Sequence, residues 1–351
     1  MNDSGEFAPQ CPIPRSEYEH VVLAHGGGGR LTRQLVEKMI LPRLGNEFLD
    51  RDHDGAVLPP QEGEMAMTTD SFVVDPIFFP GGDIGDLALN GTVNDLVSCG
   101  AEPMYISLSL ILEEGLAMED LWKIILSIER ASSTAGVKVV TGDTKVVERG
   151  KGDRIFINTT GIGSVVPGLR ISPRHCTPGD VVLINGSIGD HGIAILSARD
   201  GLGLEAGVKS DTLALNRMMS VVFRHRKEIH VLRDPTRGGV AGTLNEICLA
   251  SGTGILLDEN ELPVKDGVRG ACELLGLDPL YVANEGKMLV ILPEAHAEEV
   301  LSIMRDHEEG MESRIIGRVT EDHPGMVRMH TAIGTTRIID MISGEQLPRI
   351  C

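Results

Sequence analysis

The chain has 351 residues, which is long enough for two domains of ordinary size with substantial cores. Its formal net charge of −19 argues against binding to nucleic acid, because that affinity depends on clustered Lys and Arg. No apolar run reaches the roughly 18–20 residues of a membrane span, and no secretory signal opens the chain. The six cysteines are widely spaced, without a Cys-x-x-Cys pair, so we expect no zinc site, no disulfide framework and a cytoplasmic location.

Hydrophobic periodicity and turn residues predict alternating strands and helices in the first half of the chain. We interpret residues 1–20 as a loose extension and residues 21–168 as an N-terminal domain. The expected elements are a strand at 21–24, a helix from Leu31 that Pro42 ends, a strand within 65–79, a helix from Leu87 to Gly100, a strand at 104–112, a helix from Glu119 to Gly136, and strands at 137–140 and 155–162.

Prolines and glycines between 167 and 180 predict a linker to a C-terminal domain at 169–341, and residues 342–351 are expected to form a mobile C-terminal arm. The expected elements are a strand at 181–185, a helix starting near 190, a helix at 212–222, a strand at 230–233, a helix at 239–251, strands near 288–292 and 315–319, and a hairpin-like pair at 327–340. This alternation predicts two layered α/β domains.

Four aspartates lie at predicted strand ends or turns among small or polar neighbours: Asp70, Asp95, Asp143 and Asp234. Carboxylate oxygens suit Mg²⁺, which binds few protein carboxylates and takes phosphates and water for the remainder. Each aspartate alone could equally cap a helix or a turn. The spacing leaves both interpretations open.

Other polar positions have similar alternatives. The glycines at 26–29 could hold a phosphate with backbone N–H groups, or could form a flexible loop. Neither a P-loop nor a dinucleotide-binding motif is present. Lys145 is a phosphate contact, a base or a surface lysine, and Glu285 at a glycine turn could accept a proton. His191, at a predicted helix start, is expected to be structural rather than catalytic.

The last residue is a cysteine, Cys351, which follows Pro348-Arg349-Ile350. Chain ends are usually mobile, so this thiol is either incidental or a carrier that brings a small acyl group into an active site. Arg349 should favour the thiolate and the terminal carboxylate should oppose it. Three further cysteines in apolar segments are expected to be core thiols: Cys99, Cys248 and Cys272.

Taken in order, these motifs resemble those of the HypE family of hydrogenase-maturation carbamoyl dehydratases. That family belongs to the PurM-like superfamily, with aminoimidazole ribonucleotide synthetases and selenophosphate synthetases. The resemblance runs from about Val21 to Cys351. The motifs that carry it include Thr69-Asp70-Ser71, Asn94-Asp95, Thr141-Gly142-Asp143-Thr144-Lys145, Gly189-Asp190-His191-Gly192, Arg233-Asp234-Pro235-Thr236-Arg237-Gly238-Gly239, Ala283-Asn284-Glu285-Gly286-Lys287 and Pro348-Arg349-Ile350-Cys351.

The resemblance implies a two-domain PurM-like fold, a homodimer formed through the N-terminal domains, and Mg²⁺ and ATP in the cleft between domains. It implies that the carbamoyltransferase HypF loads a carbamoyl group onto Cys351, that ATP drives its dehydration to a thiocyanate, and that cyanide passes to iron on a HypC–HypD complex. The implied nucleotide-binding residues are Asp70, Asp95, Asp143, Asn94, Thr144, Asp234, Gly27 and Gly28, with Asp70, Asp95 and Asp234 on the metal and with Lys145 and Glu285 handling protons beside Cys351.

This chemistry is consistent with the residue types. Phosphorylation of the thiocarbamate oxygen would turn a poor leaving group into phosphate, and a base would remove the N–H protons. Two alternatives stay open: a small-molecule ATP-dependent synthetase of the same superfamily, which needs no terminal cysteine, and a non-catalytic docking protein that uses its C-terminal peptide to bind a partner.

Overall fold

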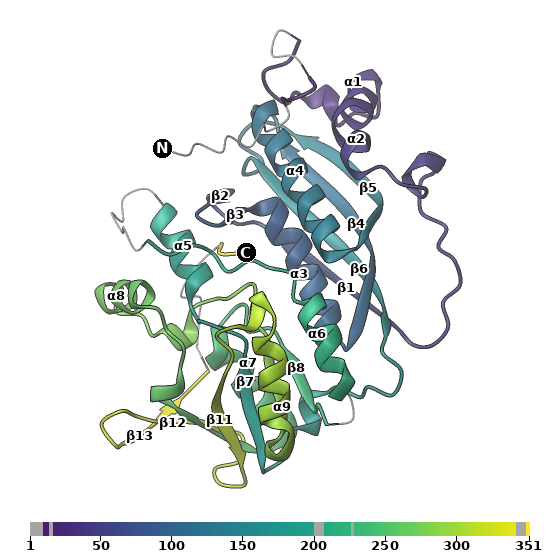
Figure 1. Cartoon of the computed structure of the whole chain (residues 1–351). Coiled ribbons are helices and arrows are strands. Elements are labelled where there is room, and N and C mark those ends of the chain that lie inside the picture. The colour runs from purple at the N-terminus through teal and green to yellow at the C-terminus, as the bar shows by residue number, and fades with distance from the viewer. Residues whose placement is uncertain (1–9, 14–16, 200–206, 226–227, 342–348) are drawn as a thin grey trace, which may run out of the picture.

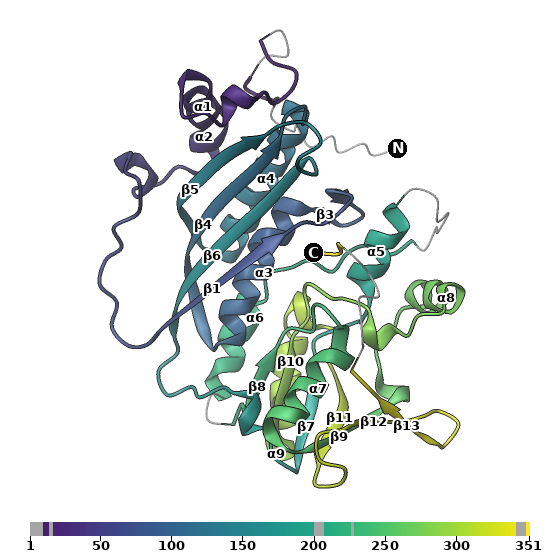
Figure 2. The ribbon, with the colours of Figure 1, turned by 180° about the vertical axis from the view of Figure 1, so that it is seen from behind.

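The computed structural model describes residues 10–13, 17–199, 207–225, 228–341 and 349–351 (Figure 1). It has a mixed α/β architecture with one main sheet in each half of the chain. The last three residues lie between the two halves, as both views of the ribbon show (Figures 1 and 2). Among the described residues, no helix is both long and apolar enough to cross a bilayer.

The sheet of the first half has four strands in the order β1-β6-β4-β5. Its pairs are antiparallel except β4–β5, which is parallel. Two helices, α3 and α4, cover one face in Figure 1, whereas the other face is turned toward the viewer and uncovered in Figure 2. The bounds are β1 Met65–Phe72, α3 Ile84–Ser98, β4 Ala101–Glu113, α4 Met118–Ala135, β5 Lys138–Val147 and β6 Ile155–Val165, with a small β2–β3 pair at Phe78–Phe79 and Gly82–Asp83.

The helix α4, which was predicted from Glu119 to Gly136, shows why such an element can be predicted from the sequence. Leu121, Ile125 and Ile128 recur at helical spacing and are all buried. Gly136 ends the helix at a φ of 74°, a conformation that glycine adopts without steric cost. The local pattern and the packing therefore agree.

The start of the chain differs from the expectation in three ways. Residues 21–24 form no strand, because Leu23–His25 is a 3₁₀ turn. The helical segment continues past Pro42, as α1 (Arg30–Leu35), a π-helical stretch (Val36–Ile40) and α2 (Leu41–Leu44), since the proline occupies a first-turn position where no N–H is needed. The described part of the expected loose extension is packed, because Ile13 is only 2% exposed.

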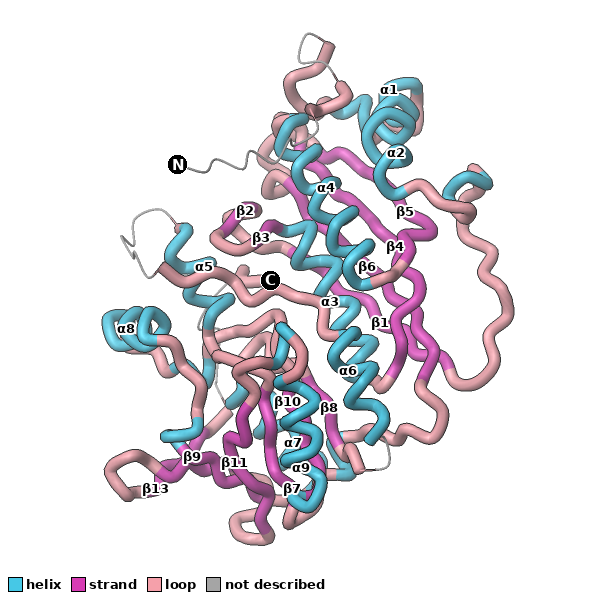
Figure 3. The backbone as a smooth tube through the Cα atoms, in the orientation of Figure 1, coloured by secondary structure: helices cyan, strands magenta, loops and turns pink. Residues whose placement is uncertain are grey.

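The second half forms a seven-stranded sheet in the order β13-β12-β9-β11-β7-β10-β8, in which only the β12–β9 pair is parallel. Figure 3 shows its helices on both sides. Three of its elements were not predicted from the sequence: β9, α8 and α9. The bounds are β7 Asp180–Ile184, α5 Asp190–Ala198, α6 Asn216–Val222, β8 Val231–Arg233, α7 Gly239–Ser251, β9 Gly254–Asp258, α8 Asp266–Leu275, β10 Leu289–Pro293, α9 Glu294–Arg305, β11 Arg314–Thr320, β12 Val327–His330 and β13 Thr336–Ile339.

The interior strand β7 is buried along its whole length. Alternate side chains serve two cores, because successive residues of a strand point to opposite faces. Val182 and Ile184 belong to the apolar cluster of α7, whereas Val181 and Leu183 belong to the cluster of α6 and α9. A sheet covered on both faces gives the C-terminal half a rigid frame.

The two halves are joined by a buried amide. The Asn94 side chain, on α3, donates to the carbonyls of Leu213 (2.9 Å) and Glu285 (3.0 Å) and accepts from the N–H of Leu215 (2.9 Å). Both of its N–H groups and one oxygen lone pair are thus used. Asn94 therefore links α3 of the first half to two segments of the second half, and its role in nucleotide binding stays a prediction.

Candidate functional site

Four carboxylates from four separate segments lie close enough to act on one another's charge. Asp70 comes from β1, Asp95 from α3, Asp234 from the loop after β8, and Glu285 from the turn before β10. Burial, followed by the charge of Asp234, raises the pKa of Asp95 to about 7. Burial also raises the pKa of Asp70, of Asp234 and, most strongly, of Glu285, on which the other carboxylates act as well. We call these four residues the acidic cluster.

Hydroxyl groups hold two members of the acidic cluster in place. Thr68 donates to Asp95 Oδ2 at 2.8 Å, and Ser98 donates to Asp234 Oδ1 at 3.3 Å. Glu285, by contrast, is only 4% exposed, and its Oε1 has no hydrogen-bond partner among the described residues. A buried carboxylate oxygen without a partner is costly, so it indicates a ligand or a proton-transfer role.

The turn that carries Glu285 is held rigidly. Asp211 pairs with Lys287 at 3.1 Å and accepts from the backbone N–H groups of Glu285 and Gly286. Burial by itself would raise the pKa of Asp211, but the charges of Lys287 and His191 and the hydrogen bonds to Asp211 together lower it. Gly286 is required here because a side chain would collide with the Asp211 carbonyl. Sequence reasoning missed Asp211 and Lys287, since only their contact in space reveals them.

The C-terminal tripeptide at 349–351, which we call the tail, is docked at the acidic cluster. The N–H of Val73 donates to the Cys351 carbonyl at 3.1 Å, and that of Asp75 donates to the Arg349 carbonyl at 3.3 Å. These two bonds hold the tripeptide antiparallel to the segment after β1, although neither segment forms a strand. Ile350 is 3% exposed and joins the apolar core of the N-terminal half. The preceding expected arm residues, 342–348, lie outside the described part of the chain.

The thiol of Cys351 has an acidic environment. Burial, followed by the charge of Glu285, raises its pKa to about 12, although Arg237 acts in the opposite direction. Arg349 does not determine that pKa as expected. Its guanidinium instead donates to the Val73 carbonyl and pairs with Asp153. The docked thiol is therefore protonated near neutral pH.

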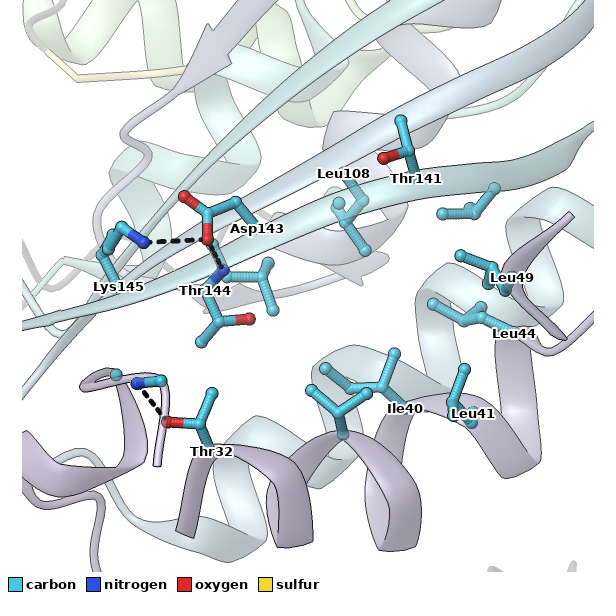
Figure 4. A pocket seen from close by; sticks show the side chains of 16 residues that line it. Thr32, Ile40, Leu41, Leu44, Leu49, Leu108, Thr141, Asp143, Thr144 and Lys145 are labelled. Atoms are coloured by element: carbon cyan, nitrogen blue, oxygen red, sulfur yellow. Dashed lines mark hydrogen bonds and ion pairs between the residues drawn. The ribbon is translucent and has the colours of Figure 1, made fainter. Parts of the chain in front are cut away.

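Asp143 and Lys145 form a second polar region, at the β5 edge. They pair with each other at 3.1 Å, and their side chains are 58% and 64% exposed. Figure 4 shows this pair at the rim of a largely apolar pocket of about 250 Å³ between β5 and the helical segment 30–44. Thr144 lines this pocket too, and its N–H donates to Asp143.

The glycine loop lies at the same pocket. Gly26 must be a glycine because a side chain would collide with Val146 of β5. The N–H of Gly28 donates to Thr32 Oγ1 at 3.0 Å. Gly27 and Gly28, expected at a phosphate, thus lie beside the β5 edge rather than in the acidic cluster.

The sheet register separates these two regions. Asp70 pairs with Thr159, Thr159 with Leu108, and Leu108 with Gly142, so the β5 edge lies three strands away from β1. At about 4.8 Å per strand this is roughly 14 Å. The same register puts Asp143 and Lys145 on the uncovered face, because residues that pair across strands share a face. Within one chain these two residues therefore do not meet the other three predicted aspartates.

Cys99 also differs from its predicted role. It is exposed at the end of α3, whereas Cys248 and Cys272 are buried in the core as expected. His191 is fully buried, and its Nε2 lies 2.9 Å from the Ile350 carbonyl of the tail.

Comparison with known proteins identifies the family. Two models match, described as the N-terminal and C-terminal domains of AIR synthase related proteins, over residues 52–165 and 177–330. Carbamoyl dehydratase HypE of Azotobacter vinelandii is 52% identical, over 94% of this chain and 97% of that protein. Carbamoyl dehydratase HypE of Escherichia coli (strain K12) is 43% identical, over 95% of this chain and 99% of that protein. The chain belongs to the HypE family of carbamoyl dehydratases.

Solved structures of the HypE family agree with this assignment. A hydrogenase maturation protein HypE in complex with ATP has a TM-score of 0.90 and 48% identity, covering 94% of this chain and 99% of that one. A HypE–HypF complex gives a TM-score of 0.78 and 47% identity, covering 88% and 99%. The expected two-domain PurM-like fold and the carbamoyl dehydratase activity are thereby confirmed.

The acidic cluster also fits a divalent cation in this HypE family member. No three His, Cys, Asp or Glu side chains of the described residues are close enough together to hold a metal by themselves. Mg²⁺ rarely needs such a cage, since it keeps waters and binds through one or two carboxylates and substrate phosphates. Burial raises the pKa of all four carboxylates, and neighbouring carboxylates add to this for Asp95, Asp234 and Glu285, so a cation would favour their charged forms.

Proposed function

We propose that this chain carries a carbamoyl group on Cys351 and uses ATP to dehydrate it to a thiocyanate, the source of the cyanide ligand of the NiFe-hydrogenase iron. The observation that carries this proposal is the docked tail, which brings the terminal thiol beside the unpaired, buried carboxyl of Glu285.

ATP is the proposed second substrate. Support comes from the HypE relative crystallised with ATP and from the acidic cluster beside the docked thiol. One or two of Asp70, Asp95 and Asp234 would hold Mg²⁺ together with phosphate oxygens and water, and the ion would offset phosphate charge during transfer. The separation of roughly 14 Å keeps Asp143 and Thr144 away from the acidic cluster of their own chain, so they would contact a nucleotide only at the apolar pocket beside β5.

The reaction balances in two steps. The thiocarbamate oxygen attacks the γ-phosphorus, the bond to ADP breaks, and one N–H proton leaves as the C=N bond forms. The C–O bond to phosphate then breaks, the second N–H proton leaves, and the C≡N bond forms. Glu285 is the proposed base for a proton, because burial and neighbouring carboxylates raise its pKa and so its basicity.

Loading must take place away from the acidic cluster. A thiol with a pKa of about 12 is almost entirely protonated at neutral pH and is a poor nucleophile. The tail would therefore undock, take its carbamoyl group from HypF, return to the cleft, and later present cyanide to a HypC–HypD complex. The solved HypE–HypF complex supports the first of these partners. We also propose a cytoplasmic location, which suits the free cysteines.

A homodimer through the N-terminal domains is the proposed assembly, with the domain boundary kept near residue 168. The uncovered face of the four-stranded sheet exposes Met67 (71%) and Ile111 (41%), an apolar surface that a second copy would cover. Lys145 lies on that face by register. If Lys145 handles a proton, it would do so at the acidic cluster of the second copy, since the acidic cluster of its own chain is roughly 14 Å away.

Intact-protein mass spectrometry tests the proposed function. With the carbamoyl donor protein, the chain should gain one carbamoyl group, and the adduct should lose the mass of one water only after ATP is added. Cys351→Ala should gain none. An adduct on another residue, or no ATP-dependent loss of water, would contradict the proposal. Substrate-dependent ATP turnover that survives Cys351→Ala would favour a small-molecule synthetase.

A further inference from the structure

Besides the side-chain contacts of Arg349 and Ile350, three backbone oxygens of the tail accept hydrogen bonds from the rest of the chain. The Arg349 carbonyl accepts from the N–H of Asp75 and from Arg199 Nη2, at 3.3 and 2.9 Å. The Cys351 carbonyl accepts from the N–H of Val73. Between them, the Ile350 carbonyl lies 2.9 Å from His191 Nε2. Of the side chains that make these contacts, only His191 of the C-terminal half is fully buried.

The hydrogen bonds of His191 determine its protonation state. The Ile350 carbonyl can only accept, so Nε2 carries the proton. On the other side of the ring, Nδ1 lies 2.8 Å from Ser210 Oγ. Ser210 Oγ already accepts from the N–H of Thr212 at 3.1 Å, so its hydroxyl proton is available for Nδ1. Burial lowers the pKa of His191 and keeps the ring neutral.

The surroundings of this ring restrict its movement. Phe79 packs edge-on against it, with ring centres 5.6 Å apart. Ser210 is itself fixed, because its N–H donates to the Pro80 carbonyl at 2.7 Å. The next residue, Asp211, supports the Glu285 turn. One short segment thus connects the histidine that holds the tail to the carboxyl that faces the thiol.

We propose that His191, kept in the Nε2–H tautomer by Ser210, is a positioning residue that fixes the Ile350 carbonyl and so aims the carbamoylated Cys351 thiol at Glu285. This inference rests on the proposed function and adds to it the contact that positions the docked thiol for the reaction. His191 does not touch the reacting atoms. It acts through the tail backbone, so every state of the thiol, whether free, carbamoylated or cyanated, can use the same contact.

Alkylation of the full chain tests docking without ATP or donor protein. His191→Leu removes the donor, whereas His191→Gln keeps an N–H near the Nε2 position. We expect iodoacetamide to label Cys351 about tenfold or more faster in His191→Leu, and near the wild-type rate in His191→Gln. Ser210→Ala, which retains the histidine, should give a smaller increase. Ser210→Ala also tests the inference if the His191→Leu variant does not fold.

Two buried thiols of the same chain separate positioning from general loosening. Cys248 and Cys272 are deep in the C-terminal half and should keep their slow labelling. A parallel rise at Cys351 and Cys248, or an unchanged rate at Cys351, would overturn the inference.

A single-turnover measurement connects docking to the reaction. With pre-carbamoylated protein, the rate of water loss at saturating ATP should fall about tenfold in His191→Leu, while the ATP concentration for half-maximal rate stays unchanged. A wild-type rate in this variant would overturn the inference and leave the proposed function standing. Absence of water loss in the wild type would instead contradict the proposed function.

Discussion

The acidic cluster and the β5 edge contain the same kinds of residue in opposite conditions. In the cluster, Glu285 is 4% exposed and its Oε1 has no partner, whereas at the edge Asp143 is 58% exposed and pairs with Lys145. Burial without a counter-charge raises carboxyl pKa values, but an exposed ion pair is screened by water. The comparison teaches that burial and pairing, rather than residue type, distinguish the two regions.

The largest expected effect comes from replacing the Glu285 carboxyl of the acidic cluster with a neutral amide. Glu285→Gln should slow ATP-dependent water loss from carbamoylated Cys351 by about 100- to 10,000-fold, because a positioned base is removed. Loading of the carbamoyl group should continue. Intact-protein mass spectrometry follows both steps. A loss of loading with normal dehydration would reverse the role that we assign to Glu285.

A smaller effect is expected at the β5 edge. Lys145→Met should slow dehydration by about 10- to 100-fold, while the free energy of unfolding changes by no more than about 0.5 kcal/mol. Chemical denaturation and single-turnover kinetics separate the two quantities. If Lys145 serves the other copy, co-expressed Lys145→Met and Glu285→Gln chains should regain activity in the mixed dimer. No recovery would place both residues in one chain's reaction.

The acidic cluster should also have a distinctive pH dependence. The pKa of Asp95 is raised to about 7 in the folded protein, so folding favours its proton and stability falls as pH rises from about 4 to 7. Asp95→Asn should therefore raise Tm at pH 8, by about 2–4 °C, and raise it less at pH 5. Thermal unfolding at both values measures this. An equal gain at pH 5 and pH 8 would contradict the raised pKa.

The smallest effect is expected for the matched exposed carboxylate. Asp143→Asn should leave Tm within about 1 °C at either pH, since its ion pair is solvated and contributes little to stability. The same thermal scans apply. A pH-dependent shift as large as that of Asp95→Asn would remove the contrast between the two regions.

Much of the fold could be predicted because local patterns and packing agree. The helix at 239–251 is observed with the predicted bounds. α9 was missed although Ala297, Val300, Leu301 and Met304 follow helical spacing and are all buried in it. The expected strand at 21–24 is absent, since Val21 makes its backbone bonds with Gly115 and Leu116 outside any strand.

The candidate site was predicted only in part. The motifs identified Asp70, Asp95, Asp234 and Glu285, but not the separation of Asp143 and Lys145, which depends on how distant strands align. His191 offered only a helix start as a signal, because its partner lies 159 residues later in the chain. Long-range pairing, rather than local propensity, decides such roles.

The fate of one oxygen atom tests the central claim most directly. Carbamoyl groups labelled with ¹⁸O would be loaded onto Cys351, ATP would be added, and the released inorganic phosphate would be analysed by mass spectrometry. Phosphorylation of the thiocarbamate oxygen predicts one ¹⁸O atom in each phosphate per thiocyanate formed. Unlabelled phosphate, with the ¹⁸O recovered in water, would contradict the account.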